Sequence, residues 1–329
     1  MNRREFITLF SCATAWPIAA RAQQAERMRR IGVLVNYPES DPIGWRNVGV
    51  LRQSLERLGW AAGRNIEIDY RWGANEIGQA AAGGAELLRL RPDLVVAIGS
   101  PSVRALQQAT RSVPVVFIAV SEPVSQGIVQ TLAKPGGNIT GFTNLEPSVG
   151  GKFLEFLKGI APRVGRVGVM FNPNTASFLE EFSRSAKQAA DKLSVEQFAA
   201  EVHTSAEIEA TVEKLGRDLN GGLMLPPDTF TAARRPLIID LAARYRVPAI
   251  YSFRHYAADG GLLSYGADLA NLIQRAATYV DRILHGEKPA TLPVQQPTKF
   301  ELVINMKTAK ALGLDVPLQL QQLADEVIE

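Results

Sequence analysis

Small polar side chains follow several apolar runs of this sequence, and their chemistry suits the binding of a small charged molecule. Ser, Asn, Asp and Thr cap helix N-termini, and Pro suits the first helical turn. The N–H groups at such a helix start can bind a carboxylate or a phosphate. With three aromatic side chains added, the candidate ligand-binding residues are Asn36, Tyr37, Ser100, Pro101, Ser102, Ser121, Glu122, Phe142, Asn172, Asp228, Thr229 and Tyr251.

Three roles can be assigned within this set. Ser100, Ser102 and Ser121, with neighbouring backbone N–H groups, are expected to hold an anionic end of the ligand. Asp228 is the candidate partner for a cationic amine. The candidate apolar walls are Tyr37, Phe142 and Tyr251. Together these roles favour an amino acid or another small carboxylate, although each residue could instead cap its own helix or pack in a core.

An enzyme acting on a small carboxylate in the same site is the alternative function. Glu122 and Asp228 could form an acid/base pair, but a rim position or contact with a ligand amine is the favoured interpretation. The only three histidines are not spaced as metal ligands, and "GGKF" lacks the residues of a phosphate-binding loop. We therefore expect no catalytic residue, no metal and no cofactor.

Charge and cysteine content restrict the possible partners. The 329 residues carry a formal net charge of +3, and Cys12 is the single cysteine. Without a concentrated basic face, binding to nucleic acid is not expected. A lone cysteine excludes a disulfide within the chain.

The first residues, "MNRREFITLFSCATAWPIAARAQQ", have the composition of an export signal. A basic start, a short apolar run and a small-x-small site are its three parts. The paired arginines favour the twin-arginine route, with residues 1–22 removed after Ala22 and the mature protein in the periplasm. An ordinary secretory signal and a lipoprotein signal at Cys12 are the alternatives.

Two short patterns repeat at nearly one spacing. "RIGVLVN" at 30–36 returns as "RVGVMFN" at 166–172, and "VPVVF" at 113–117 returns as "VPAIY" at 247–251. Chance likeness between buried strands is the alternative to a true repeat. The apolar runs are nearly continuous, as in parallel strands covered on both faces, and helical patterns separate them. The clearest helical stripe is formed by Leu269, Leu272, Ile273, Ala276, Tyr279, Val280, Ile283 and Leu284. The sequence predicts an α/β fold with two doubly wound, parallel-sheet lobes.

Three extended segments are expected to cross between these lobes as a hinge, at 134–143, 260–268 and 292–300. Ligands bind beyond the carboxyl ends of parallel strands, so two facing lobes predict a ligand cleft between them. The expected lobes are lobe 1, residues 29–141 with 266–296, and lobe 2, residues 142–265 with 297–329.

Longer blocks carry a resemblance to a known family. They are "SEPV", "LAKPGGNITGF", "GGKFLEFLK", "LAARYRVPAIY", "GGLLSYGADL" and "LPVQQPTKFELVINMKTAKALGL". Over essentially its whole length the chain resembles the tryptophan/tyrosine-type substrate-binding proteins of ABC importers. The resemblance implies a type I periplasmic-binding fold, a small-molecule ligand in the cleft, and a membrane permease with its ATPase as partners of a monomer. Ser100 replaces a common threonine and Glu122 a common aspartate, and the ligand is left open.

Overall fold

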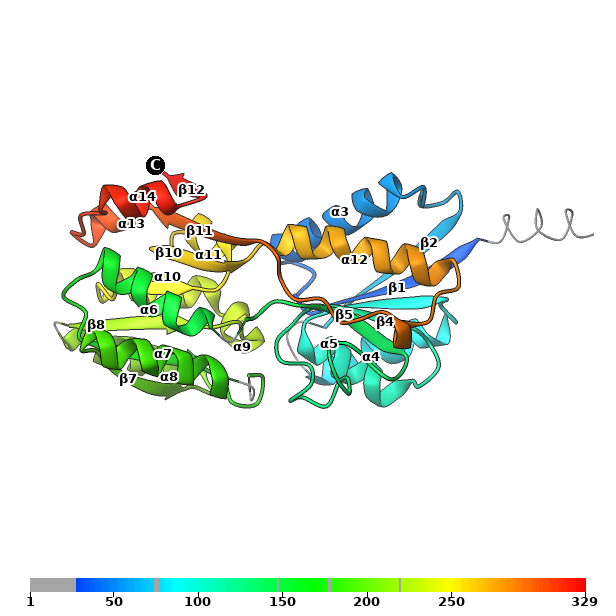
Figure 1. Cartoon of the computed structure of the whole chain (residues 1–329), viewed down its shortest axis with the longest axis horizontal. Helices are drawn as coiled ribbons and strands as arrows, with labels where there is room; N and C mark the ends of the chain where they lie inside the picture. Colours follow the sequence, from blue (N-terminus) through cyan, green and yellow to red (C-terminus); the bar gives the residue numbers. More distant parts are fainter. Residues whose placement is uncertain (1–27, 74–76, 147, 177–178, 219) are drawn as a thin grey trace, which may run out of the picture.

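The computed structural model describes residues 28–73, 77–146, 148–176, 179–218 and 220–329. They form two α/β lobes placed end to end, each with one sheet covered by helices (Figure 1). The predicted fold class is confirmed. The expected export signal at 1–22 lies outside the described residues.

Lobe 1 contains a fully parallel sheet of order β2-β1-β3-β4-β5. Helices α3 and α12 cover one face, and α4 and α5 cover the other. Successive residues of a strand point to opposite faces of the sheet. Because the central strands are apolar throughout, both faces of the sheet are apolar. The strands are β1 (Arg29–Val35), β2 (Ile66–Trp72), β3 (Leu94–Ile98), β4 (Val115–Val120) and β5 (Ile139–Thr143). The helices are α3 (Pro42–Arg57), α4 (Ile77–Arg89), α5 (Ser100–Ala109), α12 (Leu269–Leu284) and the short η1 (Pro289–Thr291).

Lobe 2 contains a sheet of order β12-β11-β10-β9-β8-β6-β7, parallel except between β10 and β11. The strands are β6 (Arg166–Phe171), β7 (Glu196–Glu201), β8 (Gly221–Leu225), β9 (Ala249–Tyr251), β10 (Leu263–Ala267), β11 (Phe300–Asn305) and β12 (Glu326–Ile328). The helices are α6 (Val149–Ile160), α7 (Glu180–Leu193), α8 (Ser205–Arg217), α9 (Thr229–Ala233), α10 (Arg235–Arg244), α11 (Arg254–Ala258), α13 (Met306–Ala311) and α14 (Leu318–Leu323).

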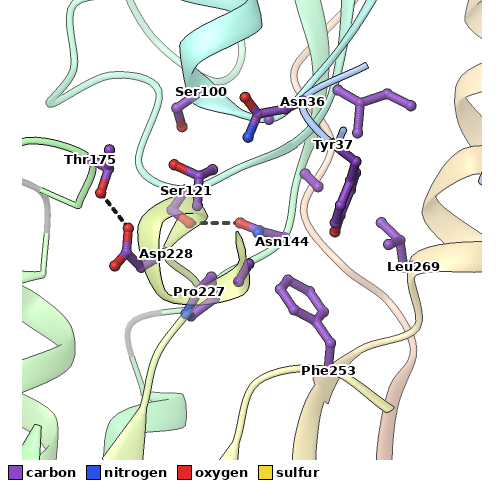
Figure 2. A pocket seen from close by; sticks show the side chains of 15 residues that line it. Asn36, Tyr37, Ser100, Ser121, Asn144, Thr175, Pro227, Asp228, Phe253 and Leu269 are labelled. Atoms are coloured by element: carbon purple, nitrogen blue, oxygen red, sulfur yellow. Dashed lines mark hydrogen bonds between the residues drawn. The ribbon is translucent and has the colours of Figure 1, made fainter. Parts of the chain in front are cut away.

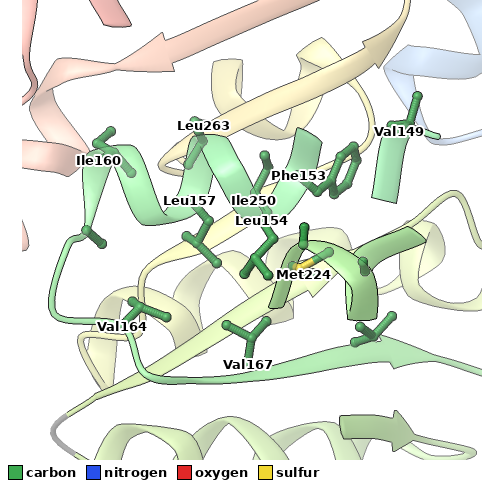
Figure 3. Close-up of a cluster of buried hydrophobic side chains, with 14 of the residues drawn as sticks. Val149, Phe153, Leu154, Leu157, Ile160, Val164, Val167, Met224, Ile250 and Leu263 are labelled. Carbon is green, nitrogen blue, oxygen red and sulfur yellow. The ribbon is translucent and has the colours of Figure 1, made fainter. Parts of the chain in front are cut away.

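The cores of the two lobes follow from the apolar stripes of their helices. In lobe 2, Phe153, Leu154 and Leu157 of α6 pack onto the sheet against Met224 and Ile250 (Figure 3). In lobe 1, the predicted stripe of α12 is buried along its length against the sheet and α3. Within the described part of the chain, no helix combines the length and apolar character of a membrane span.

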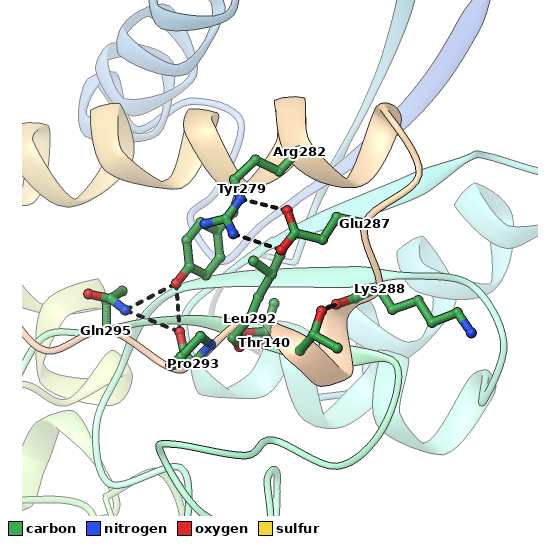
Figure 4. A network of polar contacts seen from close by, with 9 residues as sticks. Thr140, Tyr279, Arg282, Glu287, Lys288, Leu292, Pro293 and Gln295 are labelled. Carbon is green, nitrogen blue, oxygen red and sulfur yellow. Dashed lines mark hydrogen bonds and ion pairs between the residues drawn. The ribbon is translucent and has the colours of Figure 1, made fainter.

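The chain crosses between the lobes after β5, after β10 and before β11. Two crossings run side by side, because the Gln295 N–H donates to the Gly141 carbonyl at 2.9 Å and the Thr143 N–H donates to the Gln295 carbonyl at 2.9 Å. The Tyr279 hydroxyl on α12 donates to the Pro293 carbonyl at 2.7 Å and so attaches one crossing to lobe 1 (Figure 4). The expected lobe boundaries at residues 141 and 265 fall within strands β5 and β10. Both strands continue beyond them, since residues up to Thr143 and Ala267 still pair with neighbouring strands.

Candidate functional site

A cavity of about 50 Å³ lies between the lobes, beyond the carboxyl ends of strands in both sheets. Lobe 1 contributes the ends of β1, β3 and β4, and lobe 2 contributes the loops before α7 and α9 (Figure 2). The candidate residues that line it are Asn36, Tyr37, Ser100, Ser121, Asp228 and Thr229.

Nine further lining residues were not among the sequence candidates: Ile98, Gly99, Ala119, Asn144, Thr175, Pro227, Ala232, Phe253 and Leu269. Asn144 belongs to a crossing segment, Thr175 follows β6, Phe253 follows β9, and Leu269 begins α12. Phe253 and Leu269 supply apolar wall. Phe253 was detectable as the second residue beyond a predicted strand, whereas no local pattern marks Asn144 or Leu269.

The other six candidates lie away from this lining, at Pro101, Ser102, Glu122, Phe142, Asn172 and Tyr251. Phe142 and Tyr251, expected as walls, are almost fully buried in the lobe cores. Phe142 packs edge-on against Tyr279 with ring centroids 4.8 Å apart, and Tyr251 stacks on Tyr256 at the same separation. Strand alternation explains this placement, since both side chains point under a helix layer.

Pro101 and Ser102 do not line the cavity, because the first turn of α5 directs them into the lobe. Pro101 and Ser102 are buried in the first turn of α5, whereas Ser100 lies at its tip and borders the cavity. Gly99 precedes them with φ +83° and contributes no capping side chain. The start of this ten-residue helix is therefore an anion-compatible end of the cavity.

Glu122 borders a second crevice, shared with Glu181 of α7 and Gln296 of a crossing segment. Burial, followed by the charge of Glu181, raises the pKa of the Glu122 carboxyl. Because Asp228 lines the main cavity and Glu122 does not, the two carboxylates do not share one space as an acid/base pair would require.

Asp228 has a structural role in addition to its place in the lining. Its Oδ1 accepts hydrogen bonds from the Phe230 N–H (3.1 Å) and the Thr175 hydroxyl, and its Oδ2 accepts from the Asn172 N–H (3.1 Å) and the Thr231 N–H (3.3 Å). Burial raises the pKa of this carboxyl despite these bonds. These bonds tie the loops after β6 and β8 together. Four accepted bonds match the capacity of a carboxylate, so Asp228 can act on a ligand in the cavity through its charge rather than through a further hydrogen bond.

A hydrogen bond between Ser121 and Asn144 supports the opposite wall of the cavity. The Ser121 hydroxyl donates to Asn144 Oδ1 at 2.7 Å, which joins the end of β4 to a crossing segment. Burial raises the pKa of Tyr37 to about 12, so its phenol is neutral.

Within the described residues, no group of three or more His, Cys, Asp or Glu side chains could hold a metal ion.

Residues 33–328 match the family model described as ABC transporter substrate binding protein. The chain is 28% identical over 292 residues to a tyrosine-binding protein of Clostridioides difficile, which covers 88% of this chain and 82% of the relative. A structure of an ABC domain in complex with L-Trp, from Streptococcus pneumonia, is 25% identical to this chain with a TM-score of 0.81. That match covers 92% of this chain and 100% of the other.

A ligand-free, open structure of a substrate-binding protein with adhesive properties, from Clostridium difficile, has a lower TM-score with this chain than the L-Trp complex has. It is 26% identical, with a TM-score of 0.68 over 92% of this chain and 99% of the other. The arrangement described here is therefore more similar overall to the L-Trp complex than to the open structure. More distant solute-binding proteins share the two-lobe fold alone.

Proposed function

The chain belongs to the family of ABC transporter substrate-binding proteins, and from that premise we propose that its ligand is an amino acid with an aromatic side chain. It is a binding protein rather than an enzyme. The observation that carries the proposal is the cavity between the lobes, which combines an anion-compatible helix start, a buried carboxylate and apolar wall.

Each part of an amino acid has a partner of suitable chemistry in this cavity. The ligand carboxylate lies at the start of α5, near the Ser100 hydroxyl. The single proton of the Ser121 hydroxyl is already donated to Asn144 Oδ1. The ammonium group lies on the side of Asp228, the one carboxylate in the described lining. The aromatic ring packs against Tyr37 and Phe253. Relatives named for tyrosine and bound to L-Trp support this ligand class.

We further propose that the protein works in the periplasm as a monomer and delivers its ligand to a permease with an ATPase. The twin-arginine-like leader, with cleavage after Ala22, supports export. Contacts from both lobes mean that ligand binding favours the closed state, which the permease would recognise.

The ligand class is tested by calorimetry and thermal unfolding with L-Trp, L-Tyr and L-Phe. We expect one ligand bound per chain, and stabilisation of about 2.7 kcal/mol at a ligand concentration 100 times the Kd. Analogues lacking the amine or the carboxylate should bind more weakly. Absence of any stabilisation by these amino acids would reject the ligand class, and chemical conversion of a bound compound would support the enzyme alternative.

The role of Asp228 is tested with Asp228→Asn, which removes the charge and keeps one acceptor oxygen. We expect the Kd for L-Tyr to rise roughly 10- to 100-fold, because the ligand ammonium loses the attraction of a buried carboxylate charge. Binding of the matched analogue without the amine should change much less. Equal losses for both compounds would assign Asp228 to the support of its two loops alone.

A further inference from the structure

A buried arginine of lobe 2 faces lobe 1 at the interface between the lobes. Arg235 begins α10, and its side chain is 6% exposed. Its Nη1 lies 3.6 Å from Oδ2 of Asp41, the N-cap residue of α3 in lobe 1. Asp41 is also largely buried, with 15% of its side chain exposed. Two ions from different lobes are thus held together away from water.

The Nε and Nη1 atoms of Arg235 have partners in different lobes. Within lobe 2, Arg235 Nε donates to Asp259 Oδ2 at 2.6 Å. Nη1 makes no hydrogen bond in the described structure, so Asp41 is its ionic partner across the interface. His255, buried nearby, has its pKa lowered to about 3 by burial and by Arg235, Arg46 and Arg254, and is therefore neutral.

Tyr37 connects this ion pair to the ligand cavity. The phenol lines the cavity, and the charges of Asp41 and Arg235 both act on it. Neither Asp41 nor Arg235 is part of the lining. The pair therefore lies behind one wall of the cavity, where it affects how the lobes meet and does not contact the ligand.

We propose that Asp41 and Arg235 form an interlobe latch, which favours the closed arrangement and slows ligand release. The effect on release rests on the proposed function, whereas the effect on closure does not. When the lobes separate, both ions return to water and their attraction weakens. If a neutral residue replaces Asp41, closure buries Arg235 without its partner across the interface. The closed state is then less favourable.

Asp41→Asn is the main test, because asparagine keeps the Oδ1 acceptor that caps the Ile43 N–H at 2.9 Å. Asp259→Asn is the matched control, since it makes the same change beside the same arginine but within lobe 2. X-ray scattering of the ligand-free proteins measures the radius of gyration. We expect a larger radius for Asp41→Asn than for the parent, and the parent's radius for Asp259→Asn.

Ligand release is measured with L-Trp as the probe. For Asp41→Asn we expect a Kd about tenfold higher, arising mainly from faster dissociation, within the usual range of coupling between a conformational change and binding. If L-Trp does not bind the parent protein, L-Tyr or L-Phe replaces it as the probe. If none of the three binds, the proposed ligand class fails, while the scattering comparison still tests the latch.

Arg235→Gln tests the latch independently, because it removes the cation of the pair instead of the anion. It must increase the radius of gyration as Asp41→Asn does, and the double variant must increase it no further, because both remove one interaction. Unchanged radii in both single variants, or equal increases for Asp41→Asn and Asp259→Asn, would overturn the latch.

Discussion

Gly99 joins β3 to α5 with φ +83°, a left-handed backbone conformation that glycine adopts without the strain imposed by a side chain. A Cβ built at this position would lie 3.1 Å from the Cβ of Asn36, another cavity residue. Glycine here thus allows the close approach of two strand ends that form the anion-compatible side of the cavity.

For Gly99→Ala we expect a loss of about 1–2 kcal/mol in the free energy of unfolding, and a higher Kd, because the helix start and Asn36 must both shift. Gly49→Ala, within α3, is the control. Its added methyl meets nothing within 4 Å, so it should be neutral or stabilise by up to about 1 kcal/mol. Denaturant unfolding and calorimetry measure both variants, and parent-like values for Gly99→Ala would contradict the expectation.

At the residue scale, half of the candidate set shares the cavity and half does not. Ser100 and Ser102 have the same chemistry and lie two positions apart, yet Ser100 borders the cavity and Ser102 is fully buried. The difference arises from the rotation of about 100° per residue along a helix. Residue type and strand position indicate the edge of a sheet, but the turn geometry decides which side chain faces the ligand.

Among the elements, β11 enters lobe 2 from a crossing segment and runs antiparallel to β10. Glu301 lies near its start and opposite Gly266 of β10. Burial, followed by the charge of Asp268, raises the pKa of Glu301 to about 7. The folded state therefore binds a proton at this carboxyl more tightly than the unfolded chain, whose pKa is near 4.5.

Because the folded protein holds the extra proton between pH 4.5 and about 7, the contribution of Glu301 to stability falls as the pH rises through that window. We expect Glu301→Gln to raise the Tm relative to the parent at about pH 8, and the difference to disappear near pH 4.5. Thermal unfolding over this pH range measures it. A Tm difference that is the same at every pH would show that Glu301 is not the titrating group.

The elements themselves follow well from the sequence where packing is regular. Eight apolar residues at helical spacing predict helix α12, and all of them except Leu269, which borders the cavity, are buried. The sequence does not mark strands β2 and β7, because both lie at sheet edges and are interrupted by polar residues, as IEIDYRW and EQFAAE. An edge strand lacks the continuous apolar run that marks a central parallel strand.

On the scale of the whole molecule, closure brings Glu122 of lobe 1 and Glu181 of lobe 2 to one crevice. Separation of the lobes would expose Glu122 to water and remove Glu181 from its surroundings. The closed state thus raises the pKa of Glu122 above its value in the open state. Lower pH then favours closure, since the protonated form is the one that tolerates burial.

We expect ligand affinity to increase as the pH falls from neutral toward 4.5, the ordinary pKa of this carboxyl. Glu122→Gln, which is neutral at every pH, should bind more tightly than the parent at neutral pH and equally well near pH 4.5. Titrations of both proteins across the range give the ratio of their Kd values. A ratio that does not change with pH would exclude Glu122 from closure.

The sequence by itself determined that this protein has two α/β halves, since nearly continuous apolar runs and helical stripes are local patterns that repeat along the chain. It also placed polar groups at strand ends, where a cleft between facing lobes would hold a ligand. Only the tertiary structure decided which of these groups share the cavity, and that Asp41 meets Arg235. Those contacts depend on how three crossing segments set one lobe against the other, and no local pattern encodes that angle.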